Sequence, residues 1–88
     1  MSGQIGAELG QMQNLKKTFD TSSKKSVELM TSVRGALEGT WWKGPAADRF
    51  RQAWTSEFEP ALKKLEMALT EAAGEVQRRH DALQSAGS

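Results

Sequence analysis

The chain has 88 residues, no cysteine, and a formal net charge of +1 from 12 basic and 11 acidic residues. This length allows one small domain, and the lack of cysteine excludes disulfides and thiolate metal sites, so we expect oligomerisation to stabilise it and expect no metal or cofactor. The balanced charge argues against a nucleic-acid partner, because such proteins gain most of their affinity by neutralising phosphates.

The sequence predicts neither a transmembrane segment nor a Sec-type signal peptide. No apolar run approaches the roughly 18 residues that span a bilayer. The first residues, Met1 to Gln4, provide neither a charged n-region nor an apolar h-region. The simplest expectation is a cytoplasmic protein, and export would need another route.

Apolar and small residues in the first half recur every three or four positions, which predicts a helix over about 7–38. They are Met12, Leu15, Phe19, Ser23, Ser26, Met30, Val33 and Leu37. The polar segment 20–26 interrupts this stripe. Either its serines let two helices approach closely, or the helix is frayed there. Gly35 weakens the end of the helix, and Gly39 is expected to stop it.

The second half begins with a helix-start signal and predicts a helix over about 46–84, after a turn at 39–45. Gly44 suits the cap position, Pro45 suits the first helical position, and Asp48 places negative charge near the positive helix end. One stripe is expected to run through Phe50, Trp54, Phe58, Leu62, Leu65, Leu69, Ala72 and Val76, with His80 and Leu83 beyond. This spacing carries the stripe across Pro60, which favours a kinked helix over a break.

Two helices joined by a short turn predict an all-α, antiparallel two-helix hairpin in a single domain, 1–88, with frayed termini. The stripes carry more apolar width than one partner helix covers, so an exposed patch is expected on a lone hairpin. Its expected residues are Phe19, Leu29, Met30, Phe50, Trp54, Phe58 and Leu65. Pairing two hairpins into a four-helix bundle would close it. The expected core and dimer-interface residues are Leu15, Phe19, Met30, Val33, Phe50, Trp54, Phe58, Leu62, Leu65 and Leu69.

A Trp-x-Gly motif, Trp42-Lys43-Gly44, lies in the turn between two amphipathic helices. With the Pro45 helix start and the apolar ladder that follows, the whole chain resembles the WXG family (early-secreted-antigen-like proteins) of type VII secretion. The resemblance implies a hairpin that dimerises with itself or with a paralogue. It also implies export of the folded dimer, without a cleaved signal peptide, by an apparatus driven by an FtsK/SpoIIIE-type ATPase, after a cytoplasmic stage.

In the family, the export signal combines Trp-x-Gly of one protomer with a Tyr-x-x-x-Asp/Glu motif near the C-terminus of its partner. This chain has no tyrosine, and the position four before Asp81 is Gln77. The departure favours a heterodimer with a tyrosine-bearing paralogue over a homodimer. The resemblance assigns Trp42 and Gly44 both to packing of the turn and to docking. Trp41 is grouped with them, and the sequence gives it no role beyond covering apolar surface.

No catalytic constellation is present, so we expect no enzymatic activity. His80 is expected to be a partly buried or flanking histidine, and the lysine and arginine pairs are expected to form a solvated face. The main alternative function is a cytoplasmic adaptor or chaperone that stabilises a paralogous partner or larger effector. A nucleic-acid-binding hairpin dimer and a membrane-disrupting helical protein are weaker alternatives.

Overall fold

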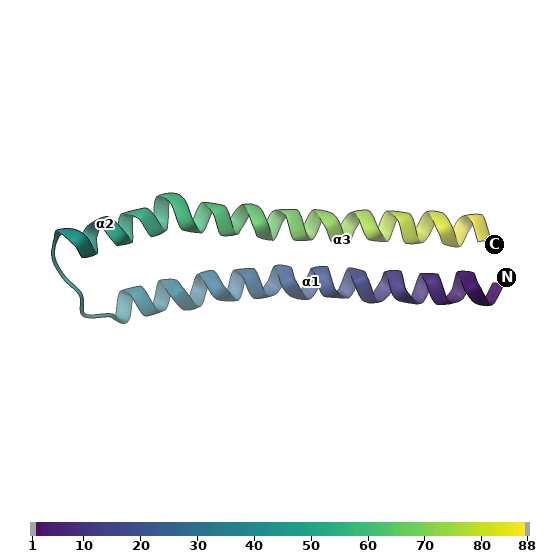
Figure 1. Cartoon of the computed structure of the whole chain (residues 1–88), viewed down its shortest axis with the longest axis horizontal. Helices are drawn as coiled ribbons and strands as arrows, with labels where there is room; N and C mark the ends of the chain where they lie inside the picture. Colours follow the sequence, from purple (N-terminus) through teal and green to yellow (C-terminus); the bar gives the residue numbers. More distant parts are fainter. Residues whose placement is uncertain (1, 88) are drawn as a thin grey trace.

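The computed structural model describes residues 2–87 and shows an extended, antiparallel helical hairpin (Figure 1). The first arm is helix α1, Ser2–Gly39. The second arm comprises helix α2, Pro45–Ala53, the π-helix η1, Trp54–Phe58, and helix α3, Glu59–Gly87, which follow one another without a gap. The molecule measures 66 × 18 × 11 Å, so it is one helix thick, with both ends of the chain at one tip and the turn at the other (Figure 1).

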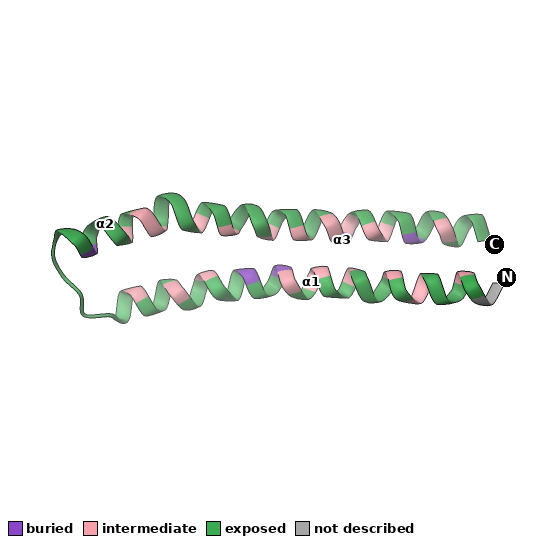
Figure 2. Ribbon diagram, viewed as in Figure 1, coloured by how far each residue is buried: buried purple, intermediate pink, exposed green. Residues whose placement is uncertain are grey.

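The two arms meet along a seam in which every step but one is three or four residues, as in a coiled coil. In α1 the buried and half-buried seam residues are Ile5, Leu9, Met12, Lys16, Phe19, Ser23, Ser26, Met30, Val33 and Leu37. In the second arm they are Ala47, Arg51, Trp54, Glu59, Leu62, Glu66, Leu69, Ala73, Val76, His80 and Leu83. Figure 2 shows buried and half-buried segments recurring along both arms, many of them where the arms face each other.

The π-helix inserts one residue into this spacing. Between Trp54 and Glu59 the seam takes a five-residue step, and the Glu59 N–H donates to the Trp54 carbonyl five residues back. Pro60 follows directly, and its ring would crowd the carbonyl of Ser56 in a regular helix. Ser56 lies inside the wider π turn. The second arm therefore continues through the proline instead of breaking there.

The single stripe expected for the second arm is wrong: Phe50 lies beside the seam residue Arg51, and the π turn that follows moves Phe58 and Leu65 out of the seam. Trp54, Leu62 and Leu69 lie in the seam, whereas Phe50, Phe58 and Leu65 are exposed. One extra residue rotates everything that follows by about 100° around the helix axis. The sequence therefore carries two stripes, and only one of them faces α1.

The polar segment of α1 is fully helical, so the frayed alternative for residues 20–26 is also wrong. Ser23 and Ser26 are buried. The hydroxyls of Ser23 and Thr70 lie 2.9 Å apart across the seam, within hydrogen-bond distance, and the Ser26 hydroxyl donates to the Ser22 carbonyl at 3.1 Å. These small side chains let the arms approach while satisfying their own polar groups.

Both arms extend beyond the bounds predicted from the sequence. The predicted ends at residues 7 and 84 lie inside α1 and α3, and the turn is correspondingly short. Of the segments expected to fray, residues 2–6 and 84–87 are helical in the structure, and Ser88 lies outside the described residues. At the open tip the arms remain close, since a Cβ placed on Gly87 would lie 3.3 Å from a methyl carbon of Ile5.

Candidate functional site: the Trp-x-Gly turn and an apolar face

Helix ends fix both sides of the turn. α1 ends at Gly39, as predicted, and Gly44 caps α2 with Pro45 in the first turn. Gly44 has φ 112° and ψ 175°, a region open essentially to glycine alone, and it is the only described residue with positive φ. Its carbonyl accepts the Asp48 N–H at 3.0 Å and so forms the first hydrogen bond of the second arm.

Arg51, which the sequence analysis overlooked, ties this turn to the second arm. Its Nη1 donates to the Trp42 carbonyl at 2.8 Å, and its Nη2 donates to the carbonyls of Thr40 at 3.2 Å and Leu37 at 3.4 Å. One signal was available in the sequence: Arg51 stands four residues after Ala47 and three before Trp54, at a seam position where an apolar residue is the norm.

The two adjacent tryptophans have different environments. The indole of Trp42 packs against Phe50, with ring centroids 5.8 Å apart, and 41% of the residue stays exposed. Trp41 is 87% exposed, so the expectation that it covers apolar surface near the turn is wrong. Of the three residues assigned to the motif, Trp42 and Gly44 are therefore built into the hairpin corner, and Trp41 projects from it.

Aromatic contacts continue from the turn along the second arm. Phe50 lies 6.4 Å from Phe58, and Phe58 lies 6.3 Å from Trp54, measured between ring centroids. Such separations fall within the range of favourable aromatic pairs. The indole N–H of Trp54 is shielded from solvent and makes no hydrogen bond within the described chain. The π turn lies between these rings and brings Phe58 onto the same side as Phe50.

Five of the exposed large apolar residues share one broad face of the hairpin, whereas others, such as Val27 and Met67, lie outside it. A single groove lies on one side of the seam. It is lined by residues that directly follow every second seam residue: Val27 and Arg34 in α1, and Thr55 and Lys63 in the second arm. The residues just before the other seam positions must then share the opposite face. They are Leu15, Leu29, Phe50, Phe58 and Leu65, all more than 40% exposed, and we call this surface the apolar face.

Small residues separate the large ones on the second arm's part of this face. Ala61, Ala68 and Ala72 alternate with Phe58 and Leu65 at three- and four-residue spacing. A helix that presents alternating large and alanine side chains lets another helix approach closely. The apolar face therefore has the pattern of a second helix-packing seam.

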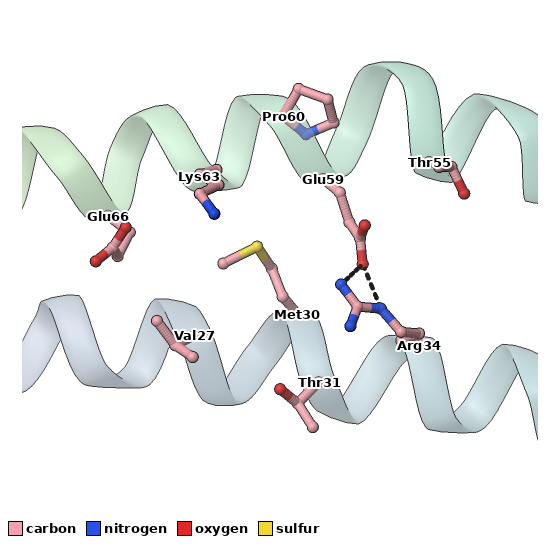
Figure 3. Close-up of a pocket in the computed structure, with 9 residues that line it drawn as sticks. All are labelled: Val27, Met30, Thr31, Arg34, Thr55, Glu59, Pro60, Lys63 and Glu66. Carbon is pink, nitrogen blue, oxygen red and sulfur yellow. Dashed lines mark hydrogen bonds and ion pairs between the residues drawn. The ribbon is translucent and has the colours of Figure 1, made fainter.

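The opposite face is polar. Its groove is lined by charged side chains of both signs, including Arg34, Glu59, Lys63 and Glu66, around Met30 and Pro60 (Figure 3). Arg34 bridges the arms by an ion pair to Glu59 at 2.7 Å. The hairpin thus presents two dissimilar faces, one apolar and one lined with charged residues of both signs.

Near the open tip, charged groups are paired along α3. Hydrogen bonding from Arg78, with the charges of Arg78 and Arg79, lowers the pKa of Glu75 below its ordinary value. His80 is buried in the seam, and its Nδ1 lies 3.1 Å from Asp81. That hydrogen bond, with one from Gln77, lowers the pKa of the Asp81 carboxyl.

Within residues 2–87, no helix is long and apolar enough to cross a membrane, and no cluster of three or more His, Asp or Glu side chains could hold a metal ion. Comparison with known proteins finds no matching family model, no matching curated protein and no matching solved structure. The functional interpretation therefore depends on the Trp-x-Gly turn and the apolar face.

Proposed function

We propose that this protein is a WXG-type partner or substrate of a type VII secretion system, exported as half of a helical dimer. The observation that carries the proposal is the physical continuity of the Trp-x-Gly turn with the apolar face. Trp42 packs on Phe50, and Phe50 packs on Phe58. A partner bound along the apolar face would therefore lie beside the turn, so that the two could form one docking surface.

The surface of the hairpin supports a dimer. Its accessible area is 6613 Å², whereas a compact monomer of 9.7 kDa exposes about 5,100 Å². The excess, about 1,500 Å² on one chain, exceeds the roughly 800 Å² that each partner buries in a standard protein interface. Its radius of gyration is 19.6 Å, against about 12 Å for a compact domain of this length. Apposing two apolar faces would produce the four-helix bundle.

The partner we favour is a paralogous hairpin that supplies the missing tyrosine motif. The chain contains no tyrosine, so by the family pattern it provides only the Trp-x-Gly half of a composite signal. In this proposal the ATPase of the secretion apparatus engages the dimer, and the protein is cytoplasmic before export. A homodimer is the other arrangement that the apolar face permits.

Export of the Trp42→Ala variant tests the proposal. In a bacterium with a type VII apparatus, co-expressed with the neighbouring paralogue, Trp42→Ala should stay in the cell while still co-purifying with its partner. Trp41→Ala is the matched control for loss of an indole from the turn. Normal export of Trp42→Ala would show that the turn is not part of an export signal in this chain.

A second candidate is a cytoplasmic adaptor that stabilises its partner, and the thin core favours it. Among the described residues the fully buried apolar side chains are only Ala47 and Ala73. Such a core predicts that the chain alone melts early and gains stability when the paralogue is added. Circular dichroism of each chain and of the mixture tests whether the chain needs its partner to fold. The export assay then distinguishes the two candidates, because an adaptor would not appear outside the cell.

A further inference from the structure

Arg51 satisfies backbone groups that neither helix satisfies by itself. The last carbonyls of a helix have no partner within it, and α1 has no basic residue in its last turn. Arg51 reaches across the hairpin and donates to the carbonyls of Leu37 and Thr40 at this end, and to Trp42 within the turn. A single side chain of the second arm therefore holds the end of α1 and the backbone of the motif.

Only a guanidinium suits this arrangement. Its five N–H donors are held in a rigid planar fork, so two nitrogens can serve three carbonyls at once. The Lys ammonium has three donors on a single nitrogen, which cannot span carbonyls that extend from Leu37 to Trp42. The positive charge also complements the negative end of the α1 dipole. Arg51 is half-buried, and its bond to the Leu37 carbonyl is partly shielded from solvent.

The position of the Trp42 ring depends on this backbone. The carbonyl that Arg51 holds at 2.8 Å belongs to Trp42 itself, and the Trp42 ring packs on Phe50, the residue before Arg51. The Trp42 N–H in turn donates to the Thr40 carbonyl at 3.0 Å, another acceptor of Arg51. Arg51 thus binds the backbone of Trp42, and Phe50 packs against its ring.

We propose that Arg51 is a positioning residue of the docking surface, which fixes the Trp-x-Gly turn so that the Trp42 indole is presented beside the apolar face. This inference rests on the proposed function, since it assigns Arg51 to the same site. Without the guanidinium, the turn would remain connected to two intact helices, but Trp42 would sample many positions.

Two substitutions separate the guanidinium from charge and packing. Arg51→Lys keeps the charge, and Arg51→Met keeps an apolar stem in the seam, so both should retain full helicity. In nuclear magnetic resonance spectra we expect the indole N–H signal of Trp42 to shift, and its backbone amide to exchange at least about tenfold faster. Arg49→Lys, two residues away and exposed, is the matched control and should leave both unchanged. Equal exchange rates at Trp42 in all three variants and the native chain would overturn the inference.

The export assay then tests the docking role. If Trp42→Ala is retained in the cell, Arg51→Lys and Arg51→Met should be retained as well, at unchanged cellular levels. Retention of Trp42→Ala with normal export of both Arg51 variants would overturn the positioning role and leave the proposed function standing. Normal export of Trp42→Ala, by contrast, would overturn the proposed function. The exchange rates would still show whether Arg51 fixes the backbone of the turn.

Discussion

At the scale of single residues, two side chains and one backbone conformation define the hairpin corner. Gly44 supplies a conformation that side chains resist, Arg51 supplies donors to unpaired carbonyls, and Trp42 covers Phe50. Backbone conformation thus explains the glycine of the motif, and packing against Phe50 explains the tryptophan. Neither depends on any partner, although both leave Trp42 partly exposed for one.

Replacing Gly44 by alanine should destabilise the protein by about 1–3 kcal/mol, because alanine avoids the backbone conformation found there. Nothing lies within 4 Å of the added methyl group, so the cost is conformational and not steric. Gly35→Ala is the matched control, since Gly35 also has open space but lies inside α1. It should stabilise the helix by about 1 kcal/mol. Urea denaturation measures both, and equal effects would contradict the assignment.

The ion pairs of Glu75 predict a pH dependence. Its pKa is lower in the folded chain than in the unfolded chain, where it is about 4.3. Its contribution to stability is therefore fully present above that pH and is lost as the pH falls through the folded pKa. Glu75→Gln should reduce the free energy of unfolding at pH 7 more than at pH 3. Glu71→Gln, an exposed glutamate four residues earlier, is the control. A Glu75→Gln effect that does not vary with pH would contradict this reading.

At the scale of elements, the π turn decides which stripe of the second arm faces α1. Before it the seam uses Ala47, Arg51 and Trp54, and after it the seam resumes at Glu59. In a regular helix the seam would instead continue through Phe58 and the residues that follow it at the same spacing. The extra residue keeps those side chains outside and puts Leu62, Leu69 and Val76 inside.

Deleting Ser56 tests this role of the π turn, in a Pro60→Ala background that serves both deletions below, because the proline ring would crowd a carbonyl of the restored regular helix. The step from Trp54 to Glu59 becomes four residues. A regular helix can then keep both Trp54 and Leu62 in the seam and Phe58 outside it. We expect the free energy of unfolding to rise, or to fall by less than about 1 kcal/mol. Deleting Ala68 from the regular part of α3 is the control. It should cost at least about 3 kcal/mol, because polar residues replace Leu69, Val76 and Leu83 in the seam. Similar losses from both deletions, measured by thermal unfolding, would contradict the role.

At the scale of the whole molecule, the hairpin is one helix thick and has two dissimilar faces. A layer of this thickness buries little apolar surface by itself, and its buried apolar side chains are alanines. The polar face carries charges of both signs, and Arg34 and Glu59 form an ion pair there. The apolar face has no such compensation, so association through it gives the largest gain in buried apolar area.

Leu29→Glu and Val27→Glu form a matched pair that tests which face associates. Leu29 is 50% exposed on the apolar face, and Val27 is 45% exposed on the polar one, two residues apart in the same helix. Leu29→Glu should raise the dissociation constant of the dimer at least about tenfold, because it buries a carboxylate at the interface. Val27→Glu should leave it unchanged. Sedimentation equilibrium measures both, and a stronger effect of Val27→Glu would move the interface to the other face.

Much of the architecture follows from the sequence alone. Three- and four-residue spacing predicts the helices, Gly39 and Pro45 mark the turn, and a short turn requires antiparallel arms. These are local properties, set by backbone propensity and by the alternation of apolar and polar residues. The surplus of apolar width, from which the exposed patch was predicted, is likewise readable without coordinates.

Only the tertiary structure decided which residues meet. The choice between two overlapping stripes depends on the π turn, whose one-residue insertion no helical periodicity reveals. The hydrogen bonds of Arg51 join residues 9 to 14 positions apart, and the Ser23 hydroxyl meets that of Thr70, 47 positions away, across the seam. Such contacts arise when one arm packs on the other, because the partner arm determines which side chain of a given turn becomes buried.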